Sequence, residues 1–371
     1  MNRNLIGETG ARNRLETRAL LIDLDALEEN LAKAAAWASS RGIALRPHAK
    51  THKSVEIARR QVAAGAVGIC VATAREAAAL AAGGIEDLLL TTPVAPGKLP
   101  HLVALAKKCR LRVVADDPEY VSALADAAGA ANMEIAVLVD LDTGLNRTGV
   151  AGVEDAVALA RQIDTAGPLR YDGLQAYYGH LQHVEAYDDR RRDVESEAVL
   201  IRAAVGALTE AGLQPRLVTG GGTGTHEIDA ELGLFTDLQL GSYVFGDVEY
   251  ESVRLRKAET MPFRTALFVR TSVVSRRGAD MVATDAGLKA FATDGPMPRV
   301  HSGGPKDAVY DFTGDEHGSV AFPGAGALPL GAAFECVVPH CDPTVNLYAD
   351  YHIVRGEELV NIWPVDGRGA A

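Results

Sequence analysis

The segment Ile43-Ala44-Leu45-Arg46-Pro47-His48-Ala49-Lys50-Thr51-His52-Lys53 joins a short apolar run to an amphipathic stretch over residues 54–64. The apolar run predicts a strand that ends at the proline, and the amphipathic stretch predicts a helix. Five side chains in the turn between them are basic or imidazole groups. A lysine crowded by cations loses part of its preference for the ammonium form, so its free amine becomes available for Schiff-base chemistry. We therefore single out Lys50, with a solvated basic loop as the alternative.

The same alternation of a short apolar run and an amphipathic stretch continues to about Gly241. The apolar runs predict eight strands, at residues 43–45, 67–71, 87–90, 111–115, 135–139, 173–177, 216–219 and 237–240. Between them, further helices are predicted at residues 75–82, 99–108, 120–128, 153–163 and 195–211. Eight βα units favour an α/β fold with a closed (β/α)8 TIM-type barrel, and an open doubly wound sheet is the alternative.

The two ends of the chain depart from this repeat. Residues 20–24 predict a strand, followed by a helix with Asp25 as its N-cap and Glu28 closing a capping box. After Glu249, β-rich runs such as 265–274 alternate with Gly and Pro, and helical periodicity is nearly absent. We predict a barrel over residues 26–250 and a mainly-β domain over residues 251–371, which the strand within residues 1–25 joins.

Composition excludes several classes of protein. With 47% hydrophobic and 23% charged residues, the chain is typical of globular proteins. Its net charge of −12 argues against nucleic acid as a partner. The sequence predicts neither a signal peptide nor a membrane span, and its four cysteines form no CxxC pair. We expect a reduced, cytoplasmic protein that contacts no membrane.

In a barrel of this type, chemistry belongs at the carboxyl ends of the strands. The seventh predicted strand is followed by the glycine-rich segment 219–225, and the eighth by Gly241-Ser242-Tyr243. Glycine lets backbone amides approach an anion closely, and phosphate sites in this fold lie after strands seven and eight. A phosphate site on one side of the barrel mouth and a lysine after the first strand together imply pyridoxal 5′-phosphate as the cofactor.

Motifs along most of the chain point to a known group of proteins. They are residues 46–53, 173–177, Gln182-His183, residues 219–223 and 239–243, and His340-Cys341-Asp342-Pro343-Thr344. By these motifs the chain resembles the fold-type III pyridoxal-phosphate enzymes of the alanine-racemase-like group. Within that group it resembles the D-threonine aldolase and D-serine dehydratase family.

The resemblance implies roles for individual residues. Lys50 is expected to carry the cofactor covalently, and His183 to act as the general base near the substrate hydroxyl. Arg147 is expected to face the cofactor or the substrate carboxylate. The cofactor-binding residues that the resemblance implies are Lys50, Arg147, Tyr177, Thr219, Gly221, Gly222, Thr223, Gly241, Ser242 and Tyr243, of which Gly221, Gly222, Thr223, Gly241 and Ser242 bind the phosphate.

The resemblance also implies a divalent metal at His340 and Asp342. In extended backbone, residues two apart point to the same side, so both side chains would face one ion while Cys341 points away. An imidazole with a carboxylate suits Mn²⁺ or Mg²⁺, with waters filling the other positions. Dehydratases of the family tend to carry cysteine at the second ligand position, which favours zinc. Asp342 therefore favours the aldolase branch.

The function that the resemblance implies is a carbon–carbon lyase dependent on pyridoxal phosphate and a divalent metal. It would cleave D-threonine-like D-β-hydroxy amino acids to glycine and an aldehyde, as a homodimer. The first alternative is a D-serine or 3-hydroxyaspartate dehydratase. A racemase would leave His340 and Asp342 without a role, a non-catalytic cofactor-binding protein would lack the β-domain, and a metal hydrolase would leave Lys50 merely structural.

Overall fold

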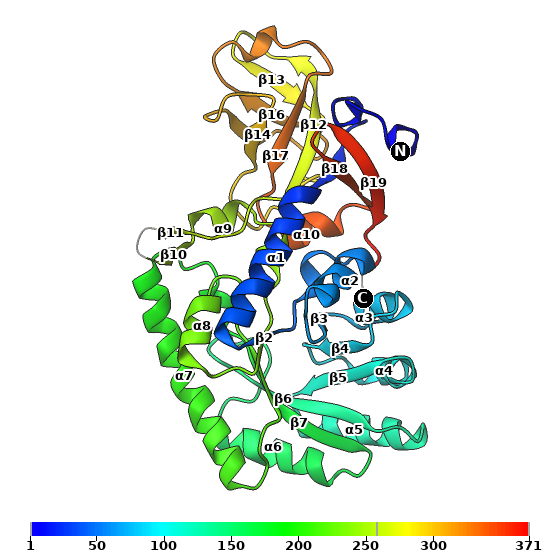
Figure 1. The fold of residues 1–371 in the computed structure, drawn as a ribbon, viewed down its shortest axis with the longest axis vertical. Coiled ribbons are helices and arrows are strands. Elements are labelled where there is room, and N and C mark those ends of the chain that lie inside the picture. The colour runs from blue at the N-terminus through cyan, green and yellow to red at the C-terminus, as the bar shows by residue number, and fades with distance from the viewer. Residues whose placement is uncertain (1, 257–258, 370–371) are drawn as a thin grey trace.

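The computed structural model describes residues 2–256 and 259–369. In Figure 1 a parallel sheet with its helices fills the lower half of the molecule, and a mostly antiparallel β-domain lies above it. Helix α1 (Leu24–Arg41) runs obliquely between the two. The predicted fold, a (β/α)8 barrel followed by a mainly-β domain, is confirmed.

All eight predicted barrel strands are present and parallel. Their order is β2-β9-β8-β7-β6-β5-β4-β3, with bounds β2 Ala44–Leu45, β3 Ile69–Val71, β4 Asp87–Leu90, β5 Arg110–Ala115, β6 Ile135–Leu141, β7 Leu169–Ala176, β8 Leu217–Gly220 and β9 Asp237–Leu238. The ring closes between β2 and β3, because Val67 N–H donates to the Leu45 carbonyl at 2.9 Å and Cys70 N–H donates to the Pro47 carbonyl at 2.8 Å. A bridge between His48 and Cys70 continues this contact.

Helices follow the strands on the outside of the barrel (Figure 1). They are α2 Val55–Ala63, α3 Ala74–Ala82, α4 Leu99–Ala106, α5 Pro118–Ala130, α6 Val153–Thr165, α7 Tyr187–Glu210 and α8 His226–Leu232, followed by α9 Val248–Ser252. Short 3₁₀ turns lie at η1 Arg3–Leu5, η2 Ala11–Arg14, η3 Ala49–Thr51, η4 Pro96–Lys98, η5 Gly179–Leu181, η6 Ser242–Val244 and η7 Ala325–Ala327. No helix in residues 2–256 and 259–369 is long and apolar enough to cross a membrane.

The β-domain is built on a nine-stranded sheet that takes in the N-terminal strand, as predicted. Strand β1 (Ala19–Asp23) pairs antiparallel with β12 (Leu267–Arg276) and parallel with β18 (Asp350–Arg355). The other strands of this sheet are β13 Met281–Thr284, β14 Arg299–Ser302, β15 Val309–Phe312, β16 Gly318–Ala321, β17 Ala333–Val337 and β19 Glu358–Pro364. The small ladder β10 Arg254–Arg256 with β11 Glu259–Thr260 and the short helix α10 (Cys341–Asn346) complete this half.

The predicted capping box of α1 is wrong. The N-cap is Asp23, whose Oδ1 accepts a hydrogen bond from Ala26 N–H at 3.0 Å, and Asp25 lies inside the first turn. Strand β1 ends at Asp23, so the chain turns directly from strand into helix with no residue left for a linker. Glu28 instead binds Arg60 on the neighbouring helix, with Oε1 to Nη1 at 3.0 Å.

Asp247 joins the barrel to the β-domain. Its side chain is fully buried; Oδ1 caps α9 by accepting from Tyr250 N–H at 3.0 Å, and Oδ2 accepts from Cys341 N–H at the start of α10, also at 3.0 Å. One carboxylate therefore fixes the helix that follows the last barrel strand to the helix that carries the predicted metal ligands.

Candidate active site

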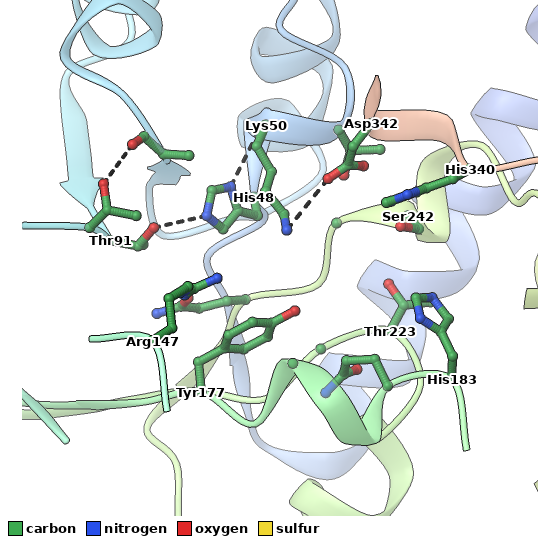
Figure 2. Close-up of a pocket in the computed structure, with 18 of the residues that line it drawn as sticks. His48, Lys50, Thr91, Arg147, Tyr177, His183, Thr223, Ser242, His340 and Asp342 are labelled. Carbon is green, nitrogen blue, oxygen red and sulfur yellow. Dashed lines mark hydrogen bonds and ion pairs between the residues drawn. The ribbon is translucent and has the colours of Figure 1, made fainter. Parts of the chain in front are cut away.

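A cavity of about 240 Å³ lies at the carboxyl ends of the barrel strands, against the β-domain. It is lined by ten of the predicted site residues, namely Lys50, Arg147, Tyr177, His183, Gly222, Thr223, Gly241, Ser242, His340 and Asp342. Lys50 and Asp342, which lie far apart in the sequence, therefore line the same pocket (Figure 2). His48, Gln175, Gln182 and Tyr250 also line it.

Lys50 lies in the 3₁₀ turn after β2, and its side chain is 37% exposed. Its Nζ is 3.4 Å from Asp342 Oδ2 and 5.9 Å from the centre of the Tyr177 ring. The phenol oxygen of Tyr177 and then the carboxylate of Asp342 raise the pKa of Lys50 above its ordinary value, against the effect of burial. The predicted lowering of this pKa by neighbouring cations is therefore wrong for the ligand-free chain.

The neighbouring cations do not act on Lys50 as predicted because most of them are neutralised. Arg46 binds Asp87 and Asp237, the first residues of β4 and β9, and so lies toward the opposite end of the barrel. Lys53 Nζ is paired with Glu76 Oε1 at 2.6 Å. His52 is buried, and burial lowers its pKa to about 4, so this imidazole is neutral.

His48 forms a wall of the pocket as a neutral imidazole. Its Nδ1 accepts from the Lys50 backbone N–H at 3.2 Å, so Nε2 carries the proton and donates to Thr91 Oγ1 at 2.9 Å. Thr91 in turn donates to the Val71 carbonyl at 3.1 Å. Burial, with the charge of Lys50 after it, lowers the pKa of His48 well below its ordinary value. Figure 2 shows this chain from Thr91 through His48 to Lys50.

Arg147 projects from the loop after β6 over the ring of Tyr177, with 5.7 Å between the guanidinium carbon and the ring centre. The loop is fastened beside it, because Thr148 Oγ1 donates to Asp140 Oδ2 at 2.8 Å. Asp140 also accepts from Gln175 Nε2 at 2.8 Å, and burial raises the pKa of this carboxyl to about 6. Arg147 is exposed and free to meet an anionic group of a ligand.

Hydrogen bonds to Thr225 and Gln182 fix the glycine-rich loop after β8 in place. Gly222 N–H donates to Thr225 Oγ1 at 3.2 Å, and Thr225 Oγ1–H donates to Asp229 Oδ2 at 2.6 Å. Gln182 ties the loop to η5, since its Oε1 accepts from Gly224 N–H at 3.0 Å. These bonds leave the Thr223 end of the loop facing the pocket (Figure 2).

This arrangement fits pyridoxal phosphate. The backbone N–H groups of Thr223 and Gly241 donate to no protein acceptor in the part of the chain that the structure describes, and both residues line the pocket. A Cβ added at Gly241 would come to 2.7 Å from Thr51 Oγ1, and one at Gly222 would collide with the Gln182 amide. The two glycines thus allow the backbone to pack closely against Thr51 and Gln182, and the free amides of Thr223 and Gly241 border the pocket that Lys50 also lines.

His340 and Asp342 share the pocket, although not through the extended backbone that we predicted. His340 is the N-cap of α10, and Asp342 lies in the first turn of that helix. Burial lowers the pKa of His340, but Asp342 and Asp294 outweigh burial and raise it. For Asp342, burial raises the pKa, and Lys50 and His340 outweigh it and hold the pKa below its ordinary value. Asp342 is therefore a carboxylate.

The two residues fit a divalent ion. His340 Nδ1 lies 2.9 Å from Asp294 Oδ2, so this nitrogen donates to the carboxylate and Nε2 keeps its lone pair for a ligand. In residues 2–256 and 259–369 no group of three or more His, Cys, Asp or Glu is arranged to hold a metal, so waters or substrate would complete the shell. The thiol of Cys341 stays protonated, because burial and then Asp247 raise its pKa.

His183 follows η5 and lies on the same side of the pocket as His340 (Figure 2). Its ring packs edge-on against Tyr250, with 4.5 Å between ring centres, and 6.4 Å from the ring of His340. Burial, and after it His340, lowers the pKa of His183 to about 4. The ring is thus unprotonated at neutral pH, as a general base must be.

Three predicted cofactor-binding residues lie outside the pocket lining. Thr219 Oγ1 accepts from Gln239 Nε2 at 3.1 Å in the barrel interior. Gly221 has a φ of +63°, and its close neighbour is Asp229 rather than the pocket. The Tyr243 hydroxyl accepts from Gln61 Nε2 at 3.1 Å, on the side of α2.

Sequence reasoning missed two carboxylates beside the pocket. Glu249 follows the last barrel strand, and Asp294 lies in a loop between β13 and β14. Neither belongs to a motif, and no signal in the sequence around them distinguishes them from surface acids. The arrangement as a whole places a lysine, free backbone amides, an imidazole–carboxylate pair and an unprotonated histidine around one cavity. It is suited to acid–base chemistry on an amino acid held by a carbonyl cofactor.

Comparison with known proteins gives consistent matches over nearly the whole chain. The family model "Alanine racemase, N-terminal domain" matches residues 22–249, and "Putative serine dehydratase domain" matches residues 266–354. A 3-hydroxy-D-aspartate aldolase of Paracoccus denitrificans (strain Pd 1222) is 36% identical over 96% of this chain and 93% of its own. A D-threonine aldolase of Arthrobacter sp. is 38% identical over the same shares. The crystal structure of D-threonine aldolase from Filomicrobium marinum is 37% identical and superposes with a TM-score of 0.91 over 96% of both chains.

Proposed function

Because this chain belongs to the alanine-racemase-like family of pyridoxal-phosphate-dependent proteins, together with D-threonine aldolase and 3-hydroxy-D-aspartate aldolase, we propose that it is a carbon–carbon lyase. Its substrates are D-β-hydroxy amino acids, and its products are glycine and an aldehyde. The proposal includes pyridoxal phosphate on Lys50 and a divalent ion, Mn²⁺ or Mg²⁺, on His340 and Asp342. It also includes a cytoplasmic homodimer.

The proposal rests mainly on the contact between Lys50 of the barrel and Asp342 of the β-domain. Asp342 lies 3.4 Å from the Nζ of Lys50, and His183 lines the same cavity. A substrate bound beside Lys50 would therefore have its β-hydroxyl near His183 and near the two residues that would hold the metal, His340 and Asp342. Cleavage of the Cα–Cβ bond needs the β-oxygen to lose its proton, and the lowered pKa of His183 in this pocket supports its part as the base.

Each residue has a defined part. Arg147 binds the substrate carboxylate, and Tyr177 supports the guanidinium from below. His183 takes the proton of the β-hydroxyl. Lys50 would hold the cofactor and give up that bond to the substrate amino group, which it displaces again to release the product. When bound, pyridoxal phosphate supplies an electron-withdrawing ring that stabilises negative charge at the α-carbon. A divalent ion at His340 and Asp342 supplies Lewis-acid polarisation of the substrate oxygen.

A dehydratase is the second candidate, favoured by the model that matches residues 266–354. Elimination needs the β-oxygen to depart as water, which a zinc ion with a thiolate ligand would assist. The buried Cys341 thiol is protonated and the second position of the pair is Asp342, so the donor set suits a hard ion that keeps its waters.

The experiment compares products. The chain is loaded with pyridoxal phosphate and Mn²⁺ or Mg²⁺ and incubated with D-threonine, D-serine and D-3-hydroxyaspartate, with and without EDTA. We expect glycine and aldehyde from D-threonine, lost on chelation and restored by the metal. Ammonia and keto acid in excess of glycine across the three substrates would assign the chain to the dehydratases.

A further inference from the structure

Beside the pocket lies an acidic side chain, that of Glu249, to which the proposed chemistry gives no role. Glu249 lies on α9 with its side chain 19% exposed, and its Oε2 is 3.6 Å from His183 Nε2. Within residues 2–256 and 259–369, no lysine, arginine or other histidine lies within 4.0 Å of its carboxylate, so the ring of His183 is its only basic neighbour there. The next acid on the same helix differs, since Glu251 is paired with Arg299, with Oε2 to Nε at 2.8 Å.

The nitrogen of His183 that faces Glu249 lacks any other partner. Nε2 is buried, and in the described part of the chain it has no hydrogen-bond partner. A buried nitrogen with no partner is costly unless something nearby can satisfy it. Glu249 is held within reach, because Gly295 of the β-domain leaves room for it: a Cβ there would lie 3.1 Å from Glu249 Oε1.

The contact between Glu249 and His183 can determine which nitrogen of the imidazole carries the proton. Which ring nitrogen carries the proton is set by the hydrogen bond that the other nitrogen makes. The other histidine of the site already has a carboxylate partner of this kind, since Asp294 Oδ2 lies 2.9 Å from His340 Nδ1. A separation of 3.6 Å is longer than a hydrogen bond, but such bonds in ligand-free sites tighten when the substrate complex forms.

We propose that Glu249 is the positioning residue of His183: its carboxylate accepts the Nε2 proton and thereby turns the Nδ1 lone pair toward the substrate hydroxyl. The inference rests on the proposed function only in naming that hydroxyl. Glu249 itself touches no reacting atom, and it acts through the orientation and tautomer of the ring. When His183 takes up a proton, the same carboxylate faces the imidazolium.

Three variants distinguish a positioning role of Glu249 from a purely structural role. Glu249→Ala removes the acceptor, Glu249→Gln keeps an accepting oxygen without charge, and Glu251→Ala is the matched control on the same helix. For Glu249→Ala we expect kcat to fall about 10- to 100-fold, as for other groups that orient a functional histidine. KM, cofactor content and metal content should stay unchanged. Glu249→Gln should recover most of kcat, and Glu251→Ala should match the wild type.

A spectroscopic measurement tests the same point without turnover. In ¹⁵N-histidine NMR of the Mg²⁺- and cofactor-loaded protein, the His183 signals are assigned by their loss in His183→Gln. We expect the Nε2–H tautomer in the wild type and in Glu249→Gln, and a shift away from it in Glu249→Ala. Unchanged kcat and tautomer in Glu249→Ala would overturn the inference, and so would an effect confined to KM. A tautomer that depends on Glu249 in a protein that cleaves no D-β-hydroxy amino acid would support the positioning and reject the proposed function.

Discussion

Asp229 bears a carboxyl group that should make both stability and cofactor binding depend on pH. Its side chain is fully buried beneath the glycine-rich loop, and it accepts hydrogen bonds from the hydroxyls of Thr225 and Tyr178. In the described residues it has no ion-pair partner within 4.0 Å. Burial therefore dominates and raises the pKa of Asp229 from 3.8 to about 7.

The direction of the effect follows from proton binding. As the pH rises through 3.8, the unfolded chain loses a proton that the folded chain keeps until about pH 7, so the free energy of unfolding falls over this window. Each pKa unit corresponds to about 1.4 kcal/mol, and the full difference therefore amounts to about 4 kcal/mol above pH 7. Between pH 5 and pH 8 the free energy of unfolding should fall by about 3 kcal/mol through this group.

Asp229→Asn keeps the shape of the side chain but cannot ionise. We expect urea unfolding of the cofactor-free protein to show about 3 kcal/mol more loss between pH 5 and pH 8 for the wild type than for the variant. Other titrating groups are common to both proteins and cancel in this comparison. An equal loss in the two proteins would refute the assignment of a proton to Asp229 in the folded state.

The same charge should weaken phosphate binding, because the ionised carboxylate lies under the loop that we expect to hold the phosphate. The affinity for pyridoxal phosphate should therefore fall more steeply from pH 6 to pH 8 in the wild type than in Asp229→Asn. Pyridoxal, which lacks the phosphate, is the matched control ligand. A wild type and variant with parallel affinity curves would show that the charge does not reach the phosphate.

Three further outcomes test the remaining assignments. Lys50→Ala should abolish turnover and the fixation of cofactor by borohydride, and fixation at another lysine would contradict the assignment. His340→Ala or Asp342→Ala should remove the divalent ion and most activity while cofactor binding persists, whereas full metal content by elemental analysis in both would reject the site. Asp294→Asn, which leaves the ligands in place but weakens the acceptor for His340 Nδ1, should lower Mn²⁺ affinity about 10- to 100-fold by EPR titration, and unchanged affinity would rule out that support.

The barrel was predictable because its strands are buried on both faces. Strand β6 is buried at every residue from Ile135 to Leu141, and such strands appear in the sequence as continuous apolar runs. Helix ends were harder to place. Helix α7 begins at Tyr187, eight residues before the predicted start at 195, because its first turns are charged and its buried face is sparse there. The N-cap of α1 shifted for a related reason: Asp23 both ends β1 and caps the helix.

The candidate site was predictable where a motif coincides with a strand end, as for Lys50 after β2 and Thr223 after β8. It was not predictable where contacts depend on tertiary packing. Asp294 meets His340 within the β-domain, and Gly295 meets Glu249 where the β-domain packs against α9. No local pattern encodes that geometry.

The pKa of Lys50 could not be predicted from the sequence. Four basic or imidazole groups near Lys50 suggested a lowered lysine pKa, but sequence proximity does not reveal which charges have partners. Arg46 is neutralised by Asp87 and Asp237, residues 41 and 191 positions away in the chain. Only the folded structure shows that the charge left beside Lys50 is the carboxylate of Asp342.

The position of Asp342 relative to Lys50 depends on how α10 is fixed to the barrel. Lys50 comes from the barrel and Asp342 from α10, and the buried carboxylate of Asp247 fixes α10 to α9 through the backbone of Cys341. Any displacement of α10 would therefore move the predicted metal ligands away from the predicted cofactor lysine as one unit. The proposed cleavage needs the substrate amino group at the cofactor that Lys50 would hold and the β-oxygen near His340 and Asp342 at the same time, so we expect it to depend on how the two domains dock.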